Sequence, residues 1–313
     1  MSENIQTIDR DTIANQYKNG ERSFVGLDLS EVDLSGLVLS ASDFSDTILT
    51  QANLNNCNLS NCKFVAANLS QATLKQTNLI AADLSFVDFN QCELINVDLS
   101  QTILEEADLS ESKIENCEFY ECVAPSCNFS ETNIKDSNFQ KATMQAADFS
   151  EAIIVNCDFS LADFNNASFA KTQVKHVNFR LSNLTQFRTN EGSVFENTNF
   201  EQIKATESVW ELTQLKDANF SHAVLTDASF QGSDLTRANL FAIDAANSNF
   251  SETILNEANL SQSNLFQSNF SNSQLLKTNL SGSNCYEVEF LDAQLLGINI
   301  KQTILYESKL AQG

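Results

Sequence analysis

Residues 52 to 69 read ANLNNCNLSNCKFVAANL, and a large apolar residue stands at every fifth position of this stretch: Leu54, Leu59, Phe64 and Leu69. Two residues before each of them stands a small residue, alanine or cysteine. A period of five fits neither a helix nor a long strand, whose periods are about 3.6 and 2.0 residues. Because residues two apart in an extended segment point to the same side, each unit is predicted to place its small and its large residue inward and then to bend.

The spacing of five continues through nearly the whole chain. From Phe24 to Leu184 it has no slip, and 27 of these 33 central positions are Leu or Phe. From Leu184 to Phe195 the separation is eleven residues, and the period then resumes up to Leu310. The chain is therefore predicted to consist of an N-terminal segment (1–23), a first repeat region (24–184), a bulge or loop that shifts the register by one residue (185–194), a second repeat region (195–310) and a tail (311–313).

The identity of the central residues recurs every 20 positions. Ile114 and Ile134 are β-branched at this spacing, and Phe119 and Phe139 follow the same rule. Four units are thus predicted to complete one turn, so that like residues stack on like, as in other solenoids. The chain would then form about 14 coils with strands roughly 4.8 Å apart.

These units resemble the pentapeptide repeat family, whose repeat is written A(D/N)LXX, in copies such as Ala82-Asp83-Leu84, Ala107-Asp108-Leu109 and Ala258-Asn259-Leu260. The resemblance covers residues 24–310 and implies an all-β fold, a right-handed quadrilateral β-helix with four pentapeptides per coil. Residues 8–23, IDRDTIANQYKNGERS, resemble the short N-terminal helical cap that precedes the first coil in many cyanobacterial members.

Seven of the eight cysteines occupy the small position two residues before a central residue, and Cys285 takes a central position. Cys117, Cys122 and Cys127 are spaced by five, which raises the alternative of a zinc site. This spacing is not that of a zinc finger or ribbon, and cysteine recurs singly at the same position elsewhere. Core packing is therefore favoured, and neither a metal site nor a cofactor is predicted.

The formal net charge is −23, from 18 basic and 41 acidic residues that are spread along the chain. Such a charge repels nucleic acid and anionic lipid, so direct binding of either is not expected. No apolar stretch is long enough for a membrane span and no export signal is evident, which predicts a soluble, cytoplasmic protein. His176 and His222 each follow a central residue by two and should point outward, and no catalytic motif accompanies them, so no enzyme is predicted.

Two regions are candidates for contact with a partner. Phe187, Arg188 and Glu191 lie in the register break, where Phe187 would be either an exposed aromatic contact or a hydrophobic plug. Leu295, Ile298, Ile300, Leu305 and Leu310 belong to the last coil, and their apolar end is expected to be covered by a second copy or by a partner. Val123-Ala124-Pro125 departs from the repeat and is expected to open or bulge the coil.

The favoured function is a non-enzymatic scaffold or regulator that presents an acidic, rod-like surface to another protein. The alternative is mimicry of DNA. Resemblance to the quinolone-resistance pentapeptide proteins would imply binding to DNA gyrase or topoisomerase and protection from its poisons, although the C-terminal helix through which those relatives dimerise is not evident in this sequence.

Overall fold

The computed structural model describes residues 8–190 and 192–310, with Lys309 and Leu310 described as backbone. The chain forms two compact units, Met1–Thr143 and Met144–Gly313. Both are parallel β-solenoids in which a residue bridges the residue 20 positions later. In the first unit Asp28 bridges Ile48, and a further bridge follows every five residues. The predicted period of 20 residues is therefore confirmed within each unit.

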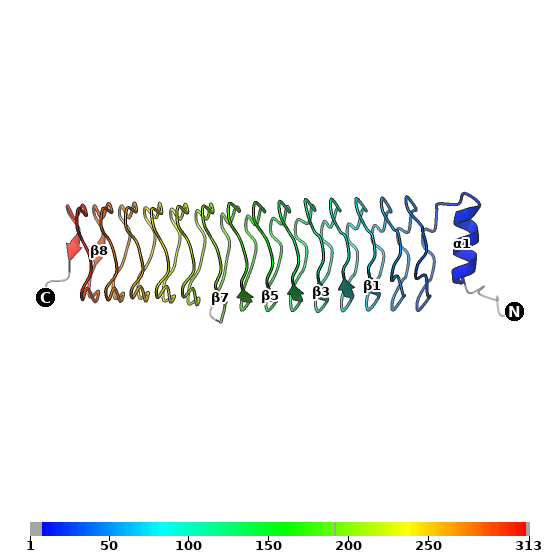
Figure 1. Cartoon of the computed structure of the whole chain (residues 1–313), viewed down its shortest axis with the longest axis horizontal. Coiled ribbons are helices and arrows are strands. Elements are labelled where there is room, and N and C mark those ends of the chain that lie inside the picture. The colour runs from blue at the N-terminus through cyan, green and yellow to red at the C-terminus, as the bar shows by residue number, and fades with distance from the viewer. Residues whose placement is uncertain (1–7, 191, 311–313) are drawn as a thin grey trace. The chain divides into compact units, whose positions relative to one another are not determined.

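In places the bridges lengthen into short strands (Figure 1). In the first unit, four parallel strands pair in chain order: β1 (Thr73–Lys75), β2 (Glu93–Ile95), β3 (Lys113–Glu115) and β4 (Asn133–Lys135). In the second unit the strands are β5 (Ile153–Val155), β6 (Gln173–Lys175) and β7 (Val194–Glu196), which pair in order, and β8 (Glu289–Phe290), which pairs with β9 (Lys309–Leu310). All of these pairs are parallel, as successive turns of one solenoid must be.

The central residue and the small residue two before it are both buried in nearly every pentapeptide, as predicted. The bend lies at the residue two after the centre, where every non-glycine residue has φ between 50° and 63°. Asn and Asp tolerate this left-handed conformation, but Gln, Glu and even Phe86 adopt it here. The backbone amide of the bent residue donates to the next coil, as from Glu31 N to Thr50 O (2.8 Å), and this bond offsets the strain.

Where an Asp or Asn precedes the centre, its side chain forms the second half of the turn. Its side-chain oxygen accepts the backbone amide of the residue after the centre, as between Asp28 Oδ1 and Ser30 N (3.1 Å). Pro125 lacks that amide, and Val123 replaces the acceptor, so the two departures compensate each other. Ala124 is buried and donates to Thr143 O at 2.7 Å, which keeps the coil regular. The predicted opening at this site is wrong for this reason.

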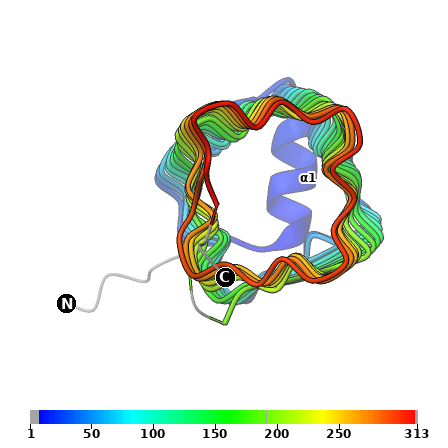
Figure 2. The same ribbon diagram turned by 90° about the vertical axis from the view of Figure 1, so that its left-hand side faces the viewer.

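A single helix of the described residues, α1 (Arg10–Lys18), begins after the N-cap residue Asp9 and buries Ile13. The Tyr17 hydroxyl donates to Ser40 O at 3.2 Å, so the helix is fixed to the first coil. Figure 2 shows α1 lying across the end of that coil, where it covers the apolar interior. Within the described ranges no helix has the length and apolarity needed to cross a membrane.

The register shift is narrower than residues 185–194. Thr189 still occupies a buried central position, and its amide donates to Val209 O at 2.8 Å. Ser193 fills the next small position, and its hydroxyl donates to Phe169 O at 3.0 Å. The additional residue therefore lies between Thr189 and Ser193, where Gly192 has a φ of 91° that favours glycine.

Candidate protein-interaction surfaces

Pentapeptides that stack through the 20-residue register form four files in each unit. A file is named here by its first central residue and includes two residues on either side of each centre. The files of the first unit are the Phe24, Leu29, Leu34 and Leu39 files, and those of the second unit are the Met144, Phe149, Ile154 and Phe159 files. Three residues of each pentapeptide lie outward, so each file offers a surface of outward side chains to a partner.

Charge in the first unit is concentrated on two adjoining files. The Phe24 file carries five carboxylates and one lysine, and the Leu29 file carries six carboxylates and no basic residue between residues 24 and 143. The Leu34 and Leu39 files carry net charges of only −1 and −2, so ten of the 13 net negative charges lie on the first two files. The carboxylates concerned are Asp43, Asp46, Asp83, Glu105 and Glu106, and Asp28, Glu31, Asp88, Asp108, Glu111 and Glu131.

The second unit repeats this segregation. Among its described side chains the Met144 file has six carboxylates and one lysine, and the Phe149 file has six carboxylates and two basic residues. The Ile154 file has four of each sign and the Phe159 file two of each, so both are neutral. The acidity is thus spread along the sequence, as expected, but it is not spread around the coil.

The basic residues of the Leu34 and Ile154 files are all held in ion pairs, and for all but Lys135, which pairs with Asp136 of its own coil, the partner lies in a neighbouring coil. Lys75 Nζ lies 2.8 Å from Glu93 Oε2, Lys175 Nζ lies 2.9 Å from Glu196 Oε1, and Arg237 forms a bidentate pair with Asp217. The side chains of these three pairs are all at least one-third exposed, so each of the three contributes little to stability. Their effect is to leave the Leu34 and Ile154 files with little net field.

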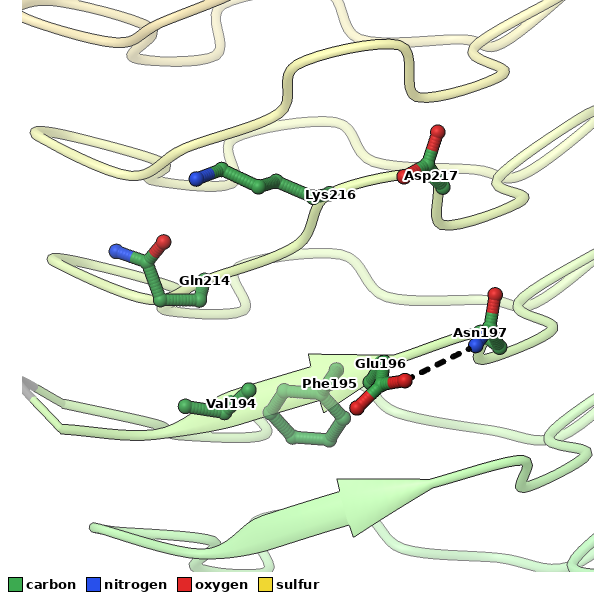
Figure 3. A pocket seen from close by; sticks show the side chains of 7 residues that line it. All are labelled: Val194, Phe195, Glu196, Asn197, Gln214, Lys216 and Asp217. Carbon is green, nitrogen blue, oxygen red and sulfur yellow. Dashed lines mark hydrogen bonds between the residues drawn. The ribbon is translucent and has the colours of Figure 1, made fainter.

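A hollow of about 340 Å³ lies on the Ile154 file next to the register shift (Figure 3). Val194, Phe195 and Glu196 of β7 line one side, and Gln214, Lys216 and Asp217 line the other. Each charged residue of the lining already has a partner: Glu196 pairs with Lys175, Lys216 with Asp234, and Asp217 with Arg237. The volume is at the lower end of the range for small-molecule pockets, about 300–1,000 Å³, and no unpaired charge of these three is left to select a ligand.

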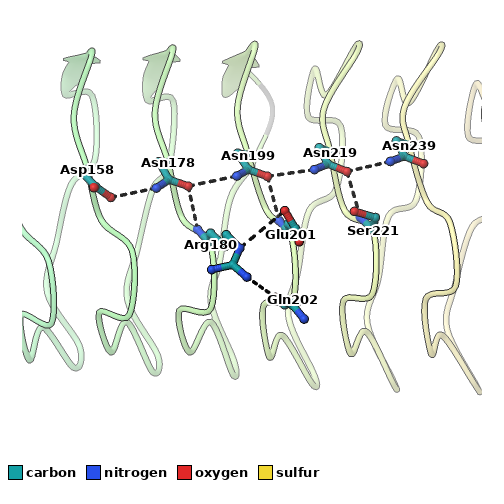
Figure 4. A network of polar contacts seen from close by, with 9 residues as sticks. All are labelled: Asp158, Asn178, Arg180, Asn199, Glu201, Gln202, Asn219, Ser221 and Asn239. Atoms are coloured by element: carbon teal, nitrogen blue, oxygen red, sulfur yellow. Dashed lines mark hydrogen bonds and ion pairs between the residues drawn. The ribbon is translucent and has the colours of Figure 1, made fainter.

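The Phe159 file carries a ladder of side-chain amides (Figure 4). Asn178 Nδ2 donates to Asp158 Oδ1 at 3.0 Å, and Asn199, Asn219 and Asn239 each donate to the residue one coil before at 2.9–3.1 Å. Each asparagine oxygen also accepts a backbone amide from its own coil in the bend that follows. Because these groups satisfy one another, the ladder is a structural feature.

The eight cysteines are buried, and none of them forms a disulfide bond. The thiol of Cys62 donates to Leu39 O at 3.1 Å, and that of Cys117 lies 3.4 Å from Leu94 O. Burial raises the pKa of Cys62 to about 12 and that of Cys117 to about 11, so both are protonated at neutral pH. In the described part of the chain, no three His, Cys, Asp or Glu side chains are placed to hold a metal ion together.

The three residues predicted at the register break do not form a common surface. Phe187 is fully buried, with its ring 4.9 Å from that of Phe169 and 4.8 Å from that of Trp210, so its assignment as an exposed contact is wrong. It takes a small position because Thr189, at the adjoining centre, leaves room for a ring. Arg188 is exposed, and Glu191 lies outside the described residues.

The residues predicted at the C-terminal end are more exposed than the residues at the equivalent positions of earlier coils. Leu295, Ile298 and Leu305 are only partly buried, and Ile300 is 43% exposed. The side chain of Leu310 lies outside the described residues. The two histidines are exposed, as expected.

Besides the segregation of charge, sequence reasoning missed the outward stack of the rings of Phe266, Tyr286 and Tyr306. Their centroids are 5.8 and 5.6 Å apart. The signal was available, because the three residues are spaced by 20 and each directly follows a central residue.

Two family models match the chain. The pentapeptide repeat region model matches residues 52–129, 94–161 and 112–189. The model of eight pentapeptide repeats matches residues 28–64, 193–232, 212–240, 233–272 and 246–282. A search of curated protein sequences finds no match.

Several solved structures are similar to this chain. HetL, a pentapeptide repeat protein involved in heterocyst differentiation regulation from the cyanobacterium Nostoc sp. strain PCC 7120, is 19% identical over 97% of this chain and 98% of its own, with a TM-score of 0.26. Rfr23, from the cyanobacterium Cyanothece 51142, is 22% identical over 34% and 87%, with a TM-score of 0.27. A trypsin-treated variant of QnrB1, a plasmid-mediated fluoroquinolone resistance protein, is 18% identical over 68% and 88%, with a TM-score of 0.34. These scores carry no argument about function.

Proposed function

Because the chain belongs to the pentapeptide repeat family, we propose that it is a non-enzymatic protein–protein interaction scaffold or regulator that presents an acidic surface to a partner protein. The observation that carries this proposal is the segregation of charge between files. In the first unit, ten of 13 net negative charges lie on the Phe24 and Leu29 files, although folding requires the same core on all four. A surface selected for solubility alone has no reason to leave two files nearly neutral.

The finer geometry belongs to the same proposal. Bridges that recur every five residues within a 20-residue register support quadrilateral coils, about 14 in number, and membership of the family implies that they are right-handed. The partial exposure of Leu295, Ile298, Ile300 and Leu305 supports the expectation that a second copy or a partner covers the apolar end of the last coil.

The proposal is tested by affinity capture from the native cell at low and moderate salt. The decisive variant is the triple substitution Glu31→Gln, Glu111→Gln and Glu131→Gln, because glutamine already occupies the equivalent corners of the Leu29 file. The matched control variant removes the same number of carboxylates from the two files with little net charge.

This control is Glu93→Gln, Glu115→Gln and Glu118→Gln, on the Leu34 and Leu39 files. We expect the first triple variant to lose the partner and the control to retain it. Capture of no reproducible partner at either salt concentration would leave the proposal without support, and equal loss in both variants would remove the role of the acidic files.

A second candidate function is DNA mimicry directed at DNA gyrase or topoisomerase, and the same segregation of charge favours it. Residues 24–143 make six 20-residue turns, so the two acidic files carry about one net charge per 2.9 Å at a coil spacing of roughly 4.8 Å, against one per 1.7 Å in B-DNA. The test is gyrase supercoiling with and without a poison. No change at micromolar protein would remove this candidate and leave the general scaffold proposal intact.

A further inference from the structure

Exposed apolar side chains are concentrated in the last described turn of the second unit. Leu296 is 73% exposed, Tyr306 67%, Leu291 56% and Ile304 55%. These side chains stand beside central positions rather than at them, so they point sideways from the coil and are not the end of the core. Stacking of another coil on the apolar end would cover them only in part, because Leu276, the equivalent of Leu296 one coil earlier, is still 37% exposed.

Tyr306 ends the aromatic ladder of the Met144 file. The rings of Phe266 and Tyr286 are nearly parallel, with 9° between their planes, and those of Tyr286 and Tyr306 differ by 19°. Phe266 and Tyr286 are half-buried, because each has a ring or the coil on both sides. Tyr306 has no described ring beyond it, so the open face of the ladder is that of Tyr306.

Two carboxylates border the ladder. The Tyr286 hydroxyl donates to Glu307 Oε2 at 3.3 Å, and Gln267 Nε2 donates to Glu287 Oε2 at 2.6 Å. Hydrogen bonding to Glu287, with the nearby charge of Glu307, raises the pKa of Tyr286. Among the described side chains, neither glutamate forms an ion pair with a lysine or arginine. Aromatic faces and unneutralised carboxylates therefore lie together.

We propose that this surface, which consists of Phe266, Tyr286, Tyr306, Glu287 and Glu307, binds an arginine-bearing segment of a partner protein. The proposal rests on the proposed function as an interaction protein and specifies the chemistry of the partner. A guanidinium group stacks its flat face on an aromatic ring and at the same time donates two parallel hydrogen bonds to a carboxylate, whereas an ammonium group has neither a flat face nor a bidentate pair of donors. The net charge of −23 attracts basic segments from a distance.

Other occupants fit this surface less well. A second copy that met it symmetrically would bring Glu287 and Glu307 against their own counterparts, which is repulsive. Nucleic acid is repelled by the same carboxylates. The chain already shows a guanidinium group on a tyrosine ring, because Arg22 Cζ lies 3.8 Å from the ring centroid of Tyr17.

The experiment measures binding of a fluorescent peptide of five Arg-Gly repeats to the full chain by anisotropy. Matched peptides replace arginine with lysine or with citrulline, which is a neutral analogue of similar shape. Tyr306→Leu removes the open ring and Glu307→Gln removes one carboxylate. Tyr120→Leu is the control, because its ring is also outward but is already occupied by Lys141.

We expect the arginine peptide to bind most tightly and the citrulline peptide not to bind. Tyr306→Leu should weaken binding of the arginine peptide about 2- to 30-fold, the range that corresponds to about 0.5–2 kcal/mol for a cation–π contact. Glu307→Gln should weaken it as well, and Tyr120→Leu should not.

Equal affinities of the arginine and lysine peptides, with no effect of Tyr306→Leu, would overturn the proposal and indicate attraction by the general field. The proposed function is judged separately, by capture of a native partner. If that partner is captured equally by wild type and by Tyr306→Leu, this surface is excluded and the scaffold function is retained.

Discussion

Phe250→Leu separates the contribution of ring stacking from that of burial. Phe250 is fully buried between Phe230 and Phe270, at centroid distances of 5.1 and 4.8 Å and interplanar angles of 1° and 9°. Leucine is the commonest central residue of the chain and keeps most of the apolar contact. The substitution nevertheless removes two stacked pairs, each worth about 0.5–1.5 kcal/mol beyond burial, so the expected loss from stacking is about 1–3 kcal/mol.

Phe89→Leu is the matched control. Phe89 is also a fully buried central residue, but no other ring stacks on it among the described residues, since leucines stand 20 positions before and after it. A hydrophobic replacement of this kind costs less than about 1.5 kcal/mol. Phe250→Ala sets the upper limit, because it also leaves a cavity and should cost about 3–5 kcal/mol.

The assay is native-state hydrogen exchange read by mass spectrometry, because a solenoid opens locally and one midpoint does not describe it. The free energy of opening is compared for the backbone amides of the substituted coil and of its two neighbours. If Phe250→Leu and Phe89→Leu cost the same within about 0.5 kcal/mol, stacking along the file contributes nothing, and the recurrence of phenylalanine every 20 residues would need another explanation.

Three further predictions concern the polar groups and thiols. The thiol of Cys62, whose pKa burial raises to about 12, should react with a disulfide reagent at pH 8 about 10³-fold more slowly than a free cysteine, and faster reaction in the folded protein would contradict the assigned burial. Ser30→Ala should raise the lowered pKa of Asp28, because the Ser30 hydroxyl is the main hydrogen-bond donor to this carboxylate. The stability that Asp28 contributes is present above its unfolded-state pKa and is lost as the pH falls through the lowered folded-state pKa. An NMR titration of the variant without an upward shift of this pKa would contradict the assignment. Asn219→Asp removes the donor to Asn199 Oδ1 and should reduce the free energy of local opening by about 1–2 kcal/mol by hydrogen exchange, whereas no change would show that the ladder is not stabilising.

The regular part of the fold was predictable because one physical rule is repeated. Residues 20 apart must stack if the coil closes after four bends, and the rings of Phe119 and Phe139 do so, 4.3 Å apart with 6° between their planes. The cysteines followed from the same rule, since any small apolar side chain fits the position two before a centre. The left-handed bend residues were not predictable by type, because the backbone bond to the next coil is common to all of them and allows Glu and Phe86 as well as Asn.

Phe187 was predicted to be either an exposed contact or a hydrophobic plug, because it was taken to lie in the register break, and its burial agrees with the second alternative. A polar residue at a centre, Thr189, suggests that the lattice has ended. In the fold its hydroxyl lies 2.6 Å from that of Thr213, which satisfies both groups inside the core. In this pentapeptide the central position holds a small residue, Thr189, and the position two before it holds a large one, Phe187. The usual sizes are reversed, so the total side-chain volume inside the coil is preserved. Only coordinates reveal such an exchange, because its partner residues lie one coil away.

The acidic files could have been found from the sequence once the period was fixed, by counting charges every 20 residues instead of along the chain. Their composition argues for a role outside folding. On the Leu29 file, Gln51 Nε2 donates to Gln71 Oε1 and Gln91 Nε2 donates to Glu111 Oε2, both at 2.8 Å, so glutamine joins neighbouring coils. Glu131 instead follows Glu111 directly, and like charges roughly 4.8 Å apart repel by about 0.9 kcal/mol in water.

Glu131→Gln should therefore stabilise the first unit by up to about 1 kcal/mol at low salt, and the gain should shrink as salt screens the pair. Gln91→Glu, the reverse change on the same file, is the control and should destabilise it, because it places a second carboxylate next to Glu111. Both are measured as free energies of local opening by hydrogen exchange at two salt concentrations. If Glu131→Gln stabilises the fold and also weakens partner capture, the carboxylate is retained for binding at the expense of stability. A loss of stability in this variant would instead make Glu131 a structural residue and remove this argument for an acidic docking surface.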